Sequence, residues 1–198
     1  MEILTRRPNC EGQTCFDRKT SRLVAALGIL LSLFVTTLGG EMSETANEYE
    51  VKAAFLYKFA SFVEWPPDSP SSTLCIGVIG QDPFGSMLEG VVRGKSINGR
   101  NFLIRRYKSA QDAVACHIVF ISSSERSRLR TVLDGLRGSA ALTVSDIPGF
   151  CENGGMIDFE ILEQKVRFVI NQEAAEQAHL KLSSKLLNVA IYVSQGTK

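Results

Sequence analysis

Residues 145–171, SDIPGFCENGGMIDFEILEQKVRFVIN, decide the fold of this chain. They begin with a glycine-rich bend, and two short segments follow in which apolar and polar side chains alternate. Such alternation is typical of β-strands with one buried face, and Glu163 and Gln164 between the segments leave room for a tight reversal. The stretch therefore predicts an antiparallel hairpin over residues 156–171.

Upstream of this stretch, apolar runs of strand length alternate with helix-like segments. The runs are residues 74–80, 101–107, 116–122 and 140–146. Asp82 is placed to cap one helix, Ser109 with Asp112 resembles a capping box, and residues 123–138 form an amphipathic helix that ends at glycine. Short connections of this kind favour right-handed crossovers, so we predict a three-layer α/β sandwich whose mainly parallel sheet has the hairpin at its edge.

Helical patterns also flank this region. Residues 43–65 show an amphipathic pattern that Ser43 can cap, with aromatic side chains on one face. Asn171 can cap a following helix, and Ser183 or Ser184 opens a last helix in SSKLLNVAIYV. The aromatic face of the first helix has two interpretations, a core face or a face that docks a second protein.

The first forty residues differ in character from the rest. Five basic residues precede an uncharged, mostly apolar run over residues 23–38, and Gly39 and Gly40 follow. This run is shorter than the roughly 20 residues of a spanning helix, so residues 1–40 are predicted to be a signal peptide. Because an Ala-x-Ala cleavage site is missing, an uncleaved membrane anchor is the alternative. Both interpretations, signal peptide and membrane anchor, predict that residues 41–198 form a single exported domain.

Composition and charge narrow the function classes. The chain has 44% apolar and 22% charged residues, which is typical of a globular domain and argues against disorder and against a polytopic membrane protein. The formal net charge is only +1, so the basic excess expected of a nucleic-acid-binding protein is missing. We therefore expect no nucleic-acid partner.

Five sequence blocks, in order, resemble the YfiR family over nearly all of residues 48–193. The blocks are AAFLYKFASFVEWP (53–66), CIGVIGQDPFG (75–85), CHIVFIS (116–122), LTVSDIPGFCENGGMIDF (142–159) and KVRFVINQEAAEQAHLKLSSKLLNVA (165–190). The resemblance implies a periplasmic, non-enzymatic α/β protein that can dimerise. It further implies repression of a membrane-bound diguanylate cyclase, or of another membrane sensor, through its periplasmic domain. Release of the repressor by redox change or envelope stress would let cyclic di-GMP rise and favour biofilm growth.

The cysteines of the predicted domain are Cys75, Cys116 and Cys151, an odd number in an oxidising compartment. Cys75 and Cys116 each begin an apolar strand, so a disulfide can join them if those strands are neighbours. The alternative is a pair of buried reduced thiols. Cys151 has no partner nearby in the sequence, which makes it a candidate redox thiol and predicts one accessible thiol in the oxidised protein.

Residues suited to catalysis or metal binding do not form a recognisable set. His117 lies within an apolar run and His179 is isolated, so neither has metal-ligand spacing, and we predict no metal and no cofactor. Acidic residues near the bend are expected to cap backbone groups or to face solvent: Asp146, Glu152, Asp158 and Glu160. Gly154 and Gly155 are expected to serve the turn, because no phosphate-binding motif surrounds them.

Three classes of function remain. The first is a protein-binding repressor, with Phe59, Phe62, Trp65, Leu187 and Ile191 as candidates for its partner surface, although core packing explains the same pattern. The second is a small-molecule-binding module, with a crevice at the strand ends near Gly80 and Ser122. The third is an enzyme, which would require Asp146, Glu152 or Asp158 to line one enclosed pocket.

Overall fold

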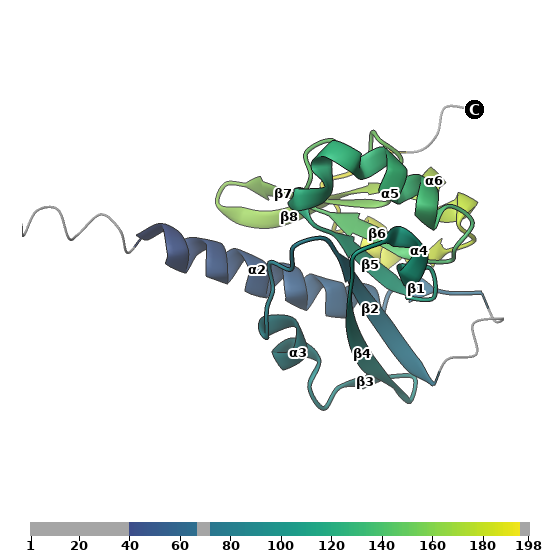
Figure 1. The fold of residues 1–198 in the computed structure, drawn as a ribbon, viewed down its shortest axis with the longest axis horizontal. Coiled ribbons are helices and arrows are strands. Elements are labelled where there is room, and N and C mark those ends of the chain that lie inside the picture. The colour runs from purple at the N-terminus through teal and green to yellow at the C-terminus, as the bar shows by residue number, and fades with distance from the viewer. Residues whose placement is uncertain (1–39, 67–71, 195–198) are drawn as a thin grey trace, which may run out of the picture. The chain divides into compact units, whose positions relative to one another are not determined.

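The computed structural model describes residues 40–66 and 72–194. Its main feature is an eight-stranded sheet with the strand order β10-β8-β7-β6-β5-β2-β4-β3 (Figure 1). Five of these strands run parallel to one another: β2 (Thr73–Ile79), β4 (Arg100–Tyr107), β5 (Ile118–Ile121), β6 (Leu142–Ser145) and β7 (Ile157–Leu162). The mainly parallel sheet is the one that the apolar runs of the sequence predict.

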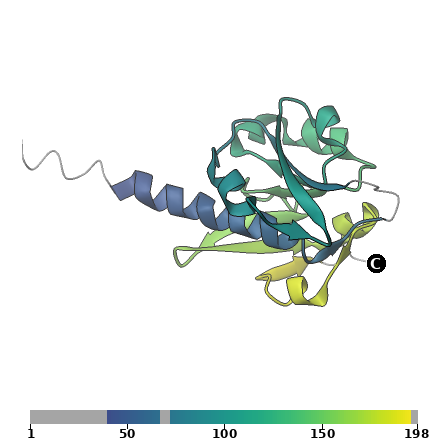
Figure 2. The same ribbon diagram turned by 90° about the horizontal axis from the view of Figure 1, so that it is seen from below.

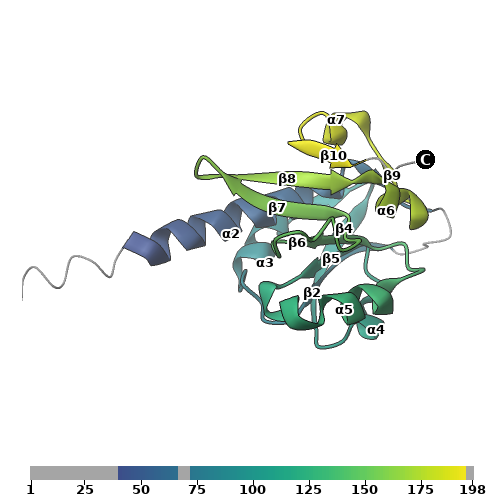
Figure 3. The same ribbon diagram turned by 90° about the horizontal axis from the view of Figure 1, so that it is seen from above.

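The predicted hairpin is present and well defined. β7 pairs antiparallel with β8 (Lys165–Asn171), with Ile157 opposite Ile170 and Leu162 opposite Lys165. The turn residues Glu163 and Gln164 have positive φ angles of 50° and 59°, as the favoured two-residue hairpin turn requires. The hairpin is not the edge of the sheet, however, because β10 (Tyr192–Ser194) lies outside it and pairs parallel with β8 (Figure 3).

Helices cover both faces of the sheet, which confirms the three-layer α/β arrangement. On one face, α2 (Gly40–Phe59), α3 (Met87–Val92) and α6 (Gln172–Gln177) contribute to a core cluster; in Figure 2, α2 is the blue helix. On the other face, α4 (Ala110–Ala113) and α5 (Leu129–Leu136) pack over a second cluster. The buried strands β5 and β6 separate the two clusters, because their successive side chains point to opposite faces.

The first helix is shifted relative to the prediction. It begins at Gly40, so Ser43 does not open it, and it ends at Phe59. A turn follows, and β1 (Val63–Glu64) pairs antiparallel with β9 (Lys181–Leu182). Trp65 precedes Pro66, and a residue before proline is disfavoured in helices, so the chain is already extended when it reaches the proline.

One predicted helix start is also wrong, and one predicted capping hydrogen bond is missing. Asp82 accepts a hydrogen bond from the backbone N–H of Phe84 at 2.8 Å, which makes a local turn, and α3 starts only at Met87. Ser109 does lie at the N-cap position of α4, as predicted, but its side chain makes no capping hydrogen bond, because its hydroxyl donates to the side chain of Gln111 instead. In both cases a short polar side chain forms a hydrogen bond with a residue two positions further along the chain and does not bond to the N–H groups at the helix N-terminus.

The segment predicted as one helix over residues 123–138 has two parts. The first is a 3-10 helix, η1 (Ser123–Arg128), capped by Ser122, and the second is α5. Asn171 caps α6 as expected, accepting from the backbone N–H of Ala174 at 3.0 Å. Thus the segment is helical, but its first turns are wound more tightly than the apolar pattern indicates.

The C-terminal tail departs most from its prediction. Ser183 caps α7 (Ser184–Leu187), but the helix then ends, and Tyr192–Ser194 form strand β10. The backbone N–H of Ile191 donates to the carbonyl of Phe168 at 2.9 Å, which aligns the tail with β8. β-Branched and aromatic side chains are common in this part of the tail and favour a strand once a partner strand is available.

Residues 1–39 of the predicted leader, which includes residues 1–40, lie outside the described residues together with its apolar run, and Gly40 is the first residue of α2. Within the ranges that are described, no helix has both the length and the apolar character needed to cross a membrane.

Candidate functional site

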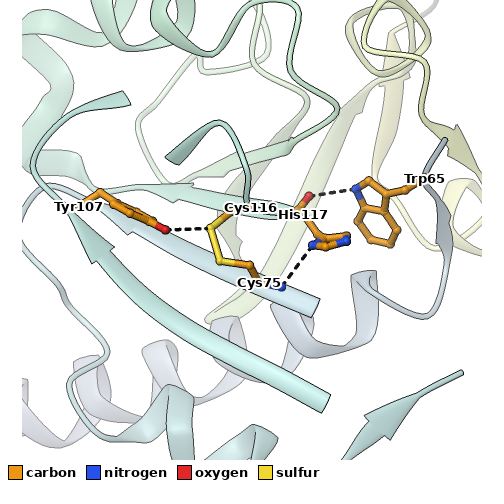
Figure 4. Close-up of a disulfide and its surroundings, with 5 residues drawn as sticks. All are labelled: Trp65, Cys75, Tyr107, Cys116 and His117. Atoms are coloured by element: carbon orange, nitrogen blue, oxygen red, sulfur yellow. Dashed lines mark hydrogen bonds between the residues drawn. A yellow bond between two sulfur atoms is a disulfide. The ribbon is translucent and has the colours of Figure 1, made fainter. Parts of the chain in front are cut away.

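A disulfide joins Cys75 of β2 to Cys116, which is separated from the start of β5 by His117 (Figure 4). The two strands are neighbours in the sheet, and the Cα atoms of the cysteines are 4.6 Å apart. Both residues are buried, so the bond lies inside the domain and not at its surface. Of the two alternatives that the sequence leaves open, the structure contains the disulfide and not the reduced pair.

Close packing surrounds this disulfide on one face of the sheet. The hydroxyl of Tyr107 lies 3.5 Å from Cys116 Sγ (Figure 4). A Cβ atom at Gly77 would lie 3.1 Å from the Tyr107 ring and 3.2 Å from Cys116 Sγ. Glycine at this position therefore lets the ring and the disulfide approach the strand closely.

His117 connects the disulfide to Trp65 on the opposite face. Its Nδ1 accepts a hydrogen bond from the backbone N–H of Cys75 at 3.2 Å, and its carbonyl accepts one from Trp65 Nε1 at 3.1 Å. The two rings meet edge to face with centroids 5.4 Å apart (Figure 4). Burial, and secondly the charge of Arg100, lower the pKa of His117. The imidazole is therefore a neutral, structural connector between the sheet and the segment that follows α2.

The five candidates for a partner surface do not share one surface. Phe59 is 1% exposed and packs against Phe159 and Phe168 in the core, so it cannot contact a partner in this structure. Phe62, Trp65 and Leu187 are partly buried against the same core. Only Ile191 is largely exposed, at 44%.

Sequence reasoning missed two exposed apolar residues beside Ile191. Val189 is 63% exposed and Tyr192 is 62% exposed, and both follow α7. We call Val189, Ile191 and Tyr192 the C-terminal apolar segment. A helical interpretation of residues 183–193 hid this segment, because it placed Leu186 and Leu187 on the same face as Ile191, whereas the chain leaves the helix before Val189.

Cys151 is not an accessible thiol. The residue is buried, and its Sγ lies 3.6 Å from the carbonyl of Met156 and 3.7 Å from that of Val169. Burial, and secondly the charge of Asp158, raise the pKa of the thiol to about 12. Because the thiolate is the reactive form, the environment of Cys151 makes it inert, and the prediction of an accessible redox thiol is wrong.

The acidic residues near the bend act locally and on different elements. Asp146 accepts hydrogen bonds from Tyr49 at 2.9 Å and Lys52 at 2.7 Å, both on α2. Asp158 accepts one from the backbone N–H of Phe150 at 3.0 Å. Glu152 is exposed on the bend. Asp146 thus pairs with a helix, Asp158 caps a turn and Glu152 faces solvent. The three carboxylates do not meet in one enclosed pocket.

The glycines of the bend have steric roles. Gly154 has a φ of 95°, and a Cβ atom at Gly155 would lie 2.1 Å from the ring of Phe150. Phe150 is fully buried, so its ring has no room to move aside. Turn formation is therefore the use of these glycines in the structure.

The strand ends near Gly80 and Ser122 do form a topological switch point, because β2 has β4 on one side and β5 on the other. The crevice predicted there is filled by η1. A Cβ atom at Gly80 would lie 2.5 Å from Ser124 Oγ and 2.8 Å from Glu125, and Ser124 Oγ accepts from the backbone N–H of Gln81 at 2.9 Å. A small molecule would have to displace these side chains.

Two solved structures share the fold. One is a conserved domain protein from Vibrio cholerae O1 biovar El Tor, with a TM-score of 0.53 and 10% identity over 74% of this chain and 60% of that chain. The other is an ABC domain from Streptococcus pneumoniae in complex with L-Trp, with a TM-score of 0.50, 12% identity and the same two coverages. This chain thus spans about 60% of the length of each, and identities so low show the fold alone.

Sequence comparison gives the family. No curated protein sequence matches the chain. The family model described as YfiR/HmsC-like matches residues 49–191, which extend from α2 to the residue before β10. This match covers well over half of the sequence and both core clusters, so the chain belongs to the YfiR/HmsC-like family.

Proposed function

We propose that this protein is an exported, non-enzymatic regulator that binds and represses the periplasmic sensory domain of a membrane signalling protein, most simply a diguanylate cyclase. The family match over residues 49–191 carries the proposal. The disulfide supports export, because such bonds persist in oxidising compartments such as the periplasm. Repression would then lower cyclic di-GMP and restrain biofilm growth.

The C-terminal apolar segment is the contact surface that this function would use. Three neighbouring apolar residues are exposed there, each by 44% or more, and Leu187 borders them. Exposed apolar groups with an aromatic anchor are the composition found at the centre of protein interfaces. The segment replaces Phe59 in the partner surface and keeps Ile191 and Leu187.

Copurification from native membranes tests this contact. The bait is the full chain, and the variants are Ile191→Glu with Tyr192→Glu, and Val114→Glu as a control. Val114 is 44% exposed at the end of α4, so its substitution adds a charge to an exposed apolar site elsewhere. We expect wild type and Val114→Glu to retain a membrane protein with a periplasmic domain and to lower cellular cyclic di-GMP. The double variant should lose both effects while its melting temperature is unchanged. Equal capture by the double variant and wild type would refute the assignment of this surface.

A cavity of about 530 Å³ between α5 and α6 favours a second function, that of a small-molecule-binding module. Arg130 and Arg137 lie at its wall, and guanidinium groups recognise carboxylates. A rise in melting temperature with small carboxylic acids, lost in Arg130→Ala and obtained without any protein partner, would favour this function. The absence of a rise with every acid tested would eliminate it.

A further inference from the structure

The outer edge of β4 is largely unpaired within the described part of the chain. β2 pairs with β4 along Asn101–Tyr107 on one side, whereas β3 (Ser96–Ile97) pairs on the other side only with Arg100 and Asn101. The ladder stops because the chain turns away at Lys95, whose backbone N–H donates to the carbonyl of Val92 at 3.0 Å. Figure 1 shows β3 and β4 at the end of the sheet away from the β7–β8 hairpin.

The direction of the free backbone groups follows from one hydrogen bond. The carbonyl of Tyr107 accepts from the backbone N–H of Gly80, so the polar groups of Tyr107 face β2. Successive residues of a strand direct these groups to opposite sides. The N–H and C=O groups of Phe102, Ile104 and Arg106 therefore point to the unpaired side, which is the arrangement that accepts an added strand.

A groove follows this edge. It has a volume of about 580 Å³ and is open to solvent, with Arg93 and Lys95 on the side of the loop after α3 and Asn101–Ile104 on the side of β4. Leu103 is 37% exposed in its wall. The groove thus offers an extended backbone, an apolar contact and cationic side chains together.

The charge around this groove is strongly one-sided. Between Gly90 and Ser109 there are six basic residues and no acidic residue: Arg93, Lys95, Arg100, Arg105, Arg106 and Lys108. Arg106 is neutralised by Asp82 and by Glu89, which is the acidic residue in the groove lining. Arg93, Arg105 and Lys108 remain exposed. Since the whole chain has a net charge of only +1, this concentration of positive charge is local.

We propose that the β4 edge groove binds an acidic, extended peptide segment of another protein, which adds to the sheet as a strand beside β4. Backbone hydrogen bonds to Phe102, Ile104 and Arg106 would supply the affinity, and Arg93 and Lys95, which line the groove, would select carboxylate side chains. This surface lies at the opposite end of the sheet from β10, so it is a second contact surface and does not depend on the C-terminal apolar segment.

The direct test uses two short capped peptides, one alternating glutamate with valine and one alternating lysine with valine. Binding to the full chain is measured by calorimetry, and the site is located from backbone amide NMR shifts. The glutamate peptide should bind, shift the amides of Phe102, Ile104 and Arg106, and bind more weakly as salt is added. The lysine peptide should not bind.

Charge-reversal variants distinguish specific binding of the peptide in the groove from nonspecific electrostatic attraction between the peptide and the protein. Arg93→Glu with Lys95→Glu changes the groove, and Arg126→Glu with Arg167→Glu makes the same change in net charge at exposed positions of η1 and β8. We expect the groove variant to weaken binding by about tenfold or more and the control to leave it almost unchanged. Equal losses in the two variants, shifts confined to other strands, or binding to vesicles of anionic lipid without binding of the glutamate peptide would each overturn the proposal.

Discussion

At the scale of single residues, Gly155 is the position that tolerates change least. A side chain there would overlap the ring of Phe150, which is fully buried. We expect Gly155→Ala to lower the free energy of unfolding by about 3 kcal/mol, because the ring or the bend must shift in a close-packed core. Urea denaturation measures the change.

The matched control for this substitution is Gly90→Ala. Gly90 lies in α3, and a Cβ atom there would meet nothing within 4 Å. Alanine should stabilise this helix by about 0.5–1 kcal/mol, since glycine is the poorer helix former. A Gly155→Ala protein as stable as wild type would show that the bend is not held by this contact.

Asp158 controls part of the pH dependence of stability. Burial, the largest cause, raises its pKa from 3.8 to about 6, and Glu160 and Asp146 add to the effect. The native protein therefore takes up this proton at higher pH than the unfolded chain does. The contribution of Asp158 is fully stabilising below about pH 4, and it is lost as the pH rises through about 6.

This effect is best measured as a difference between two proteins. Buried, neutral His117 acts in the opposite direction, since the unfolded chain protonates it first as the pH falls. Asp158→Asn removes the titration of Asp158 and leaves that of His117. The unfolding free energy of the variant minus that of wild type should therefore fall as the pH is lowered from about 6 to about 4, because only wild type gains stability from the protonation of Asp158. Glu152→Gln, at an exposed position on the same bend, should follow wild type. A constant difference for Asp158→Asn would contradict the raised pKa.

At the scale of elements, local patterns predicted the strands and missed the pairing between distant segments. The hairpin could be predicted because the alternation and the turn residues Glu163 and Gln164 are all local. β1 could not, because Val63 becomes a strand only by pairing with Leu182, far along the chain. The last predicted helix was shortened for the same reason, since β8 aligns residues 192–194 as a strand.

For the candidate site, the partners of the disulfide could be predicted from the sequence, whereas the exposure of individual side chains could not. Cys75 and Cys116 begin two apolar runs, and parallel strands that begin together place their first residues side by side. Exposure was not predictable in this way. Phe59 and Phe62 have the same aromatic character and lie one turn apart, yet only Phe59 is fully buried. Cys151 is a second example, because its thiol is enclosed by contacts with the carbonyls of Met156 and Val169. Whether a residue is buried depends on which distant segments pack over it. The hydrophobic pattern of its own helix or strand does not indicate this packing.

At the scale of the whole molecule, the disulfide closes one loop of the chain and leaves the rest of the described residues without a cross-link. The loop that it closes spans a sequence separation of 41 residues and contains α3, β3, β4 and α4. The β4 edge groove therefore lies entirely within the cross-linked loop. We expect reduction to loosen β4 first, because beyond β4 the sheet has only the two-residue edge strand β3, whereas β6 lies in the interior of the sheet with several strands on each side.

The measurement compares the oxidised protein, the reduced protein and the variant Cys75→Ala with Cys116→Ala. Loss of a cross-link over a loop of this length should lower the free energy of unfolding by about 4 kcal/mol in the chain-entropy model. The reduced wild type isolates the cross-link, because it keeps both sulfur atoms in the core, and the alanine variant adds the loss of their packing. Hydrogen exchange should show the largest loss of protection at β4, and Cys151→Ser should keep the same sensitivity to reductant. If reduction left both stability and the protection of β4 unchanged, the cross-link would not be what holds β4 in place.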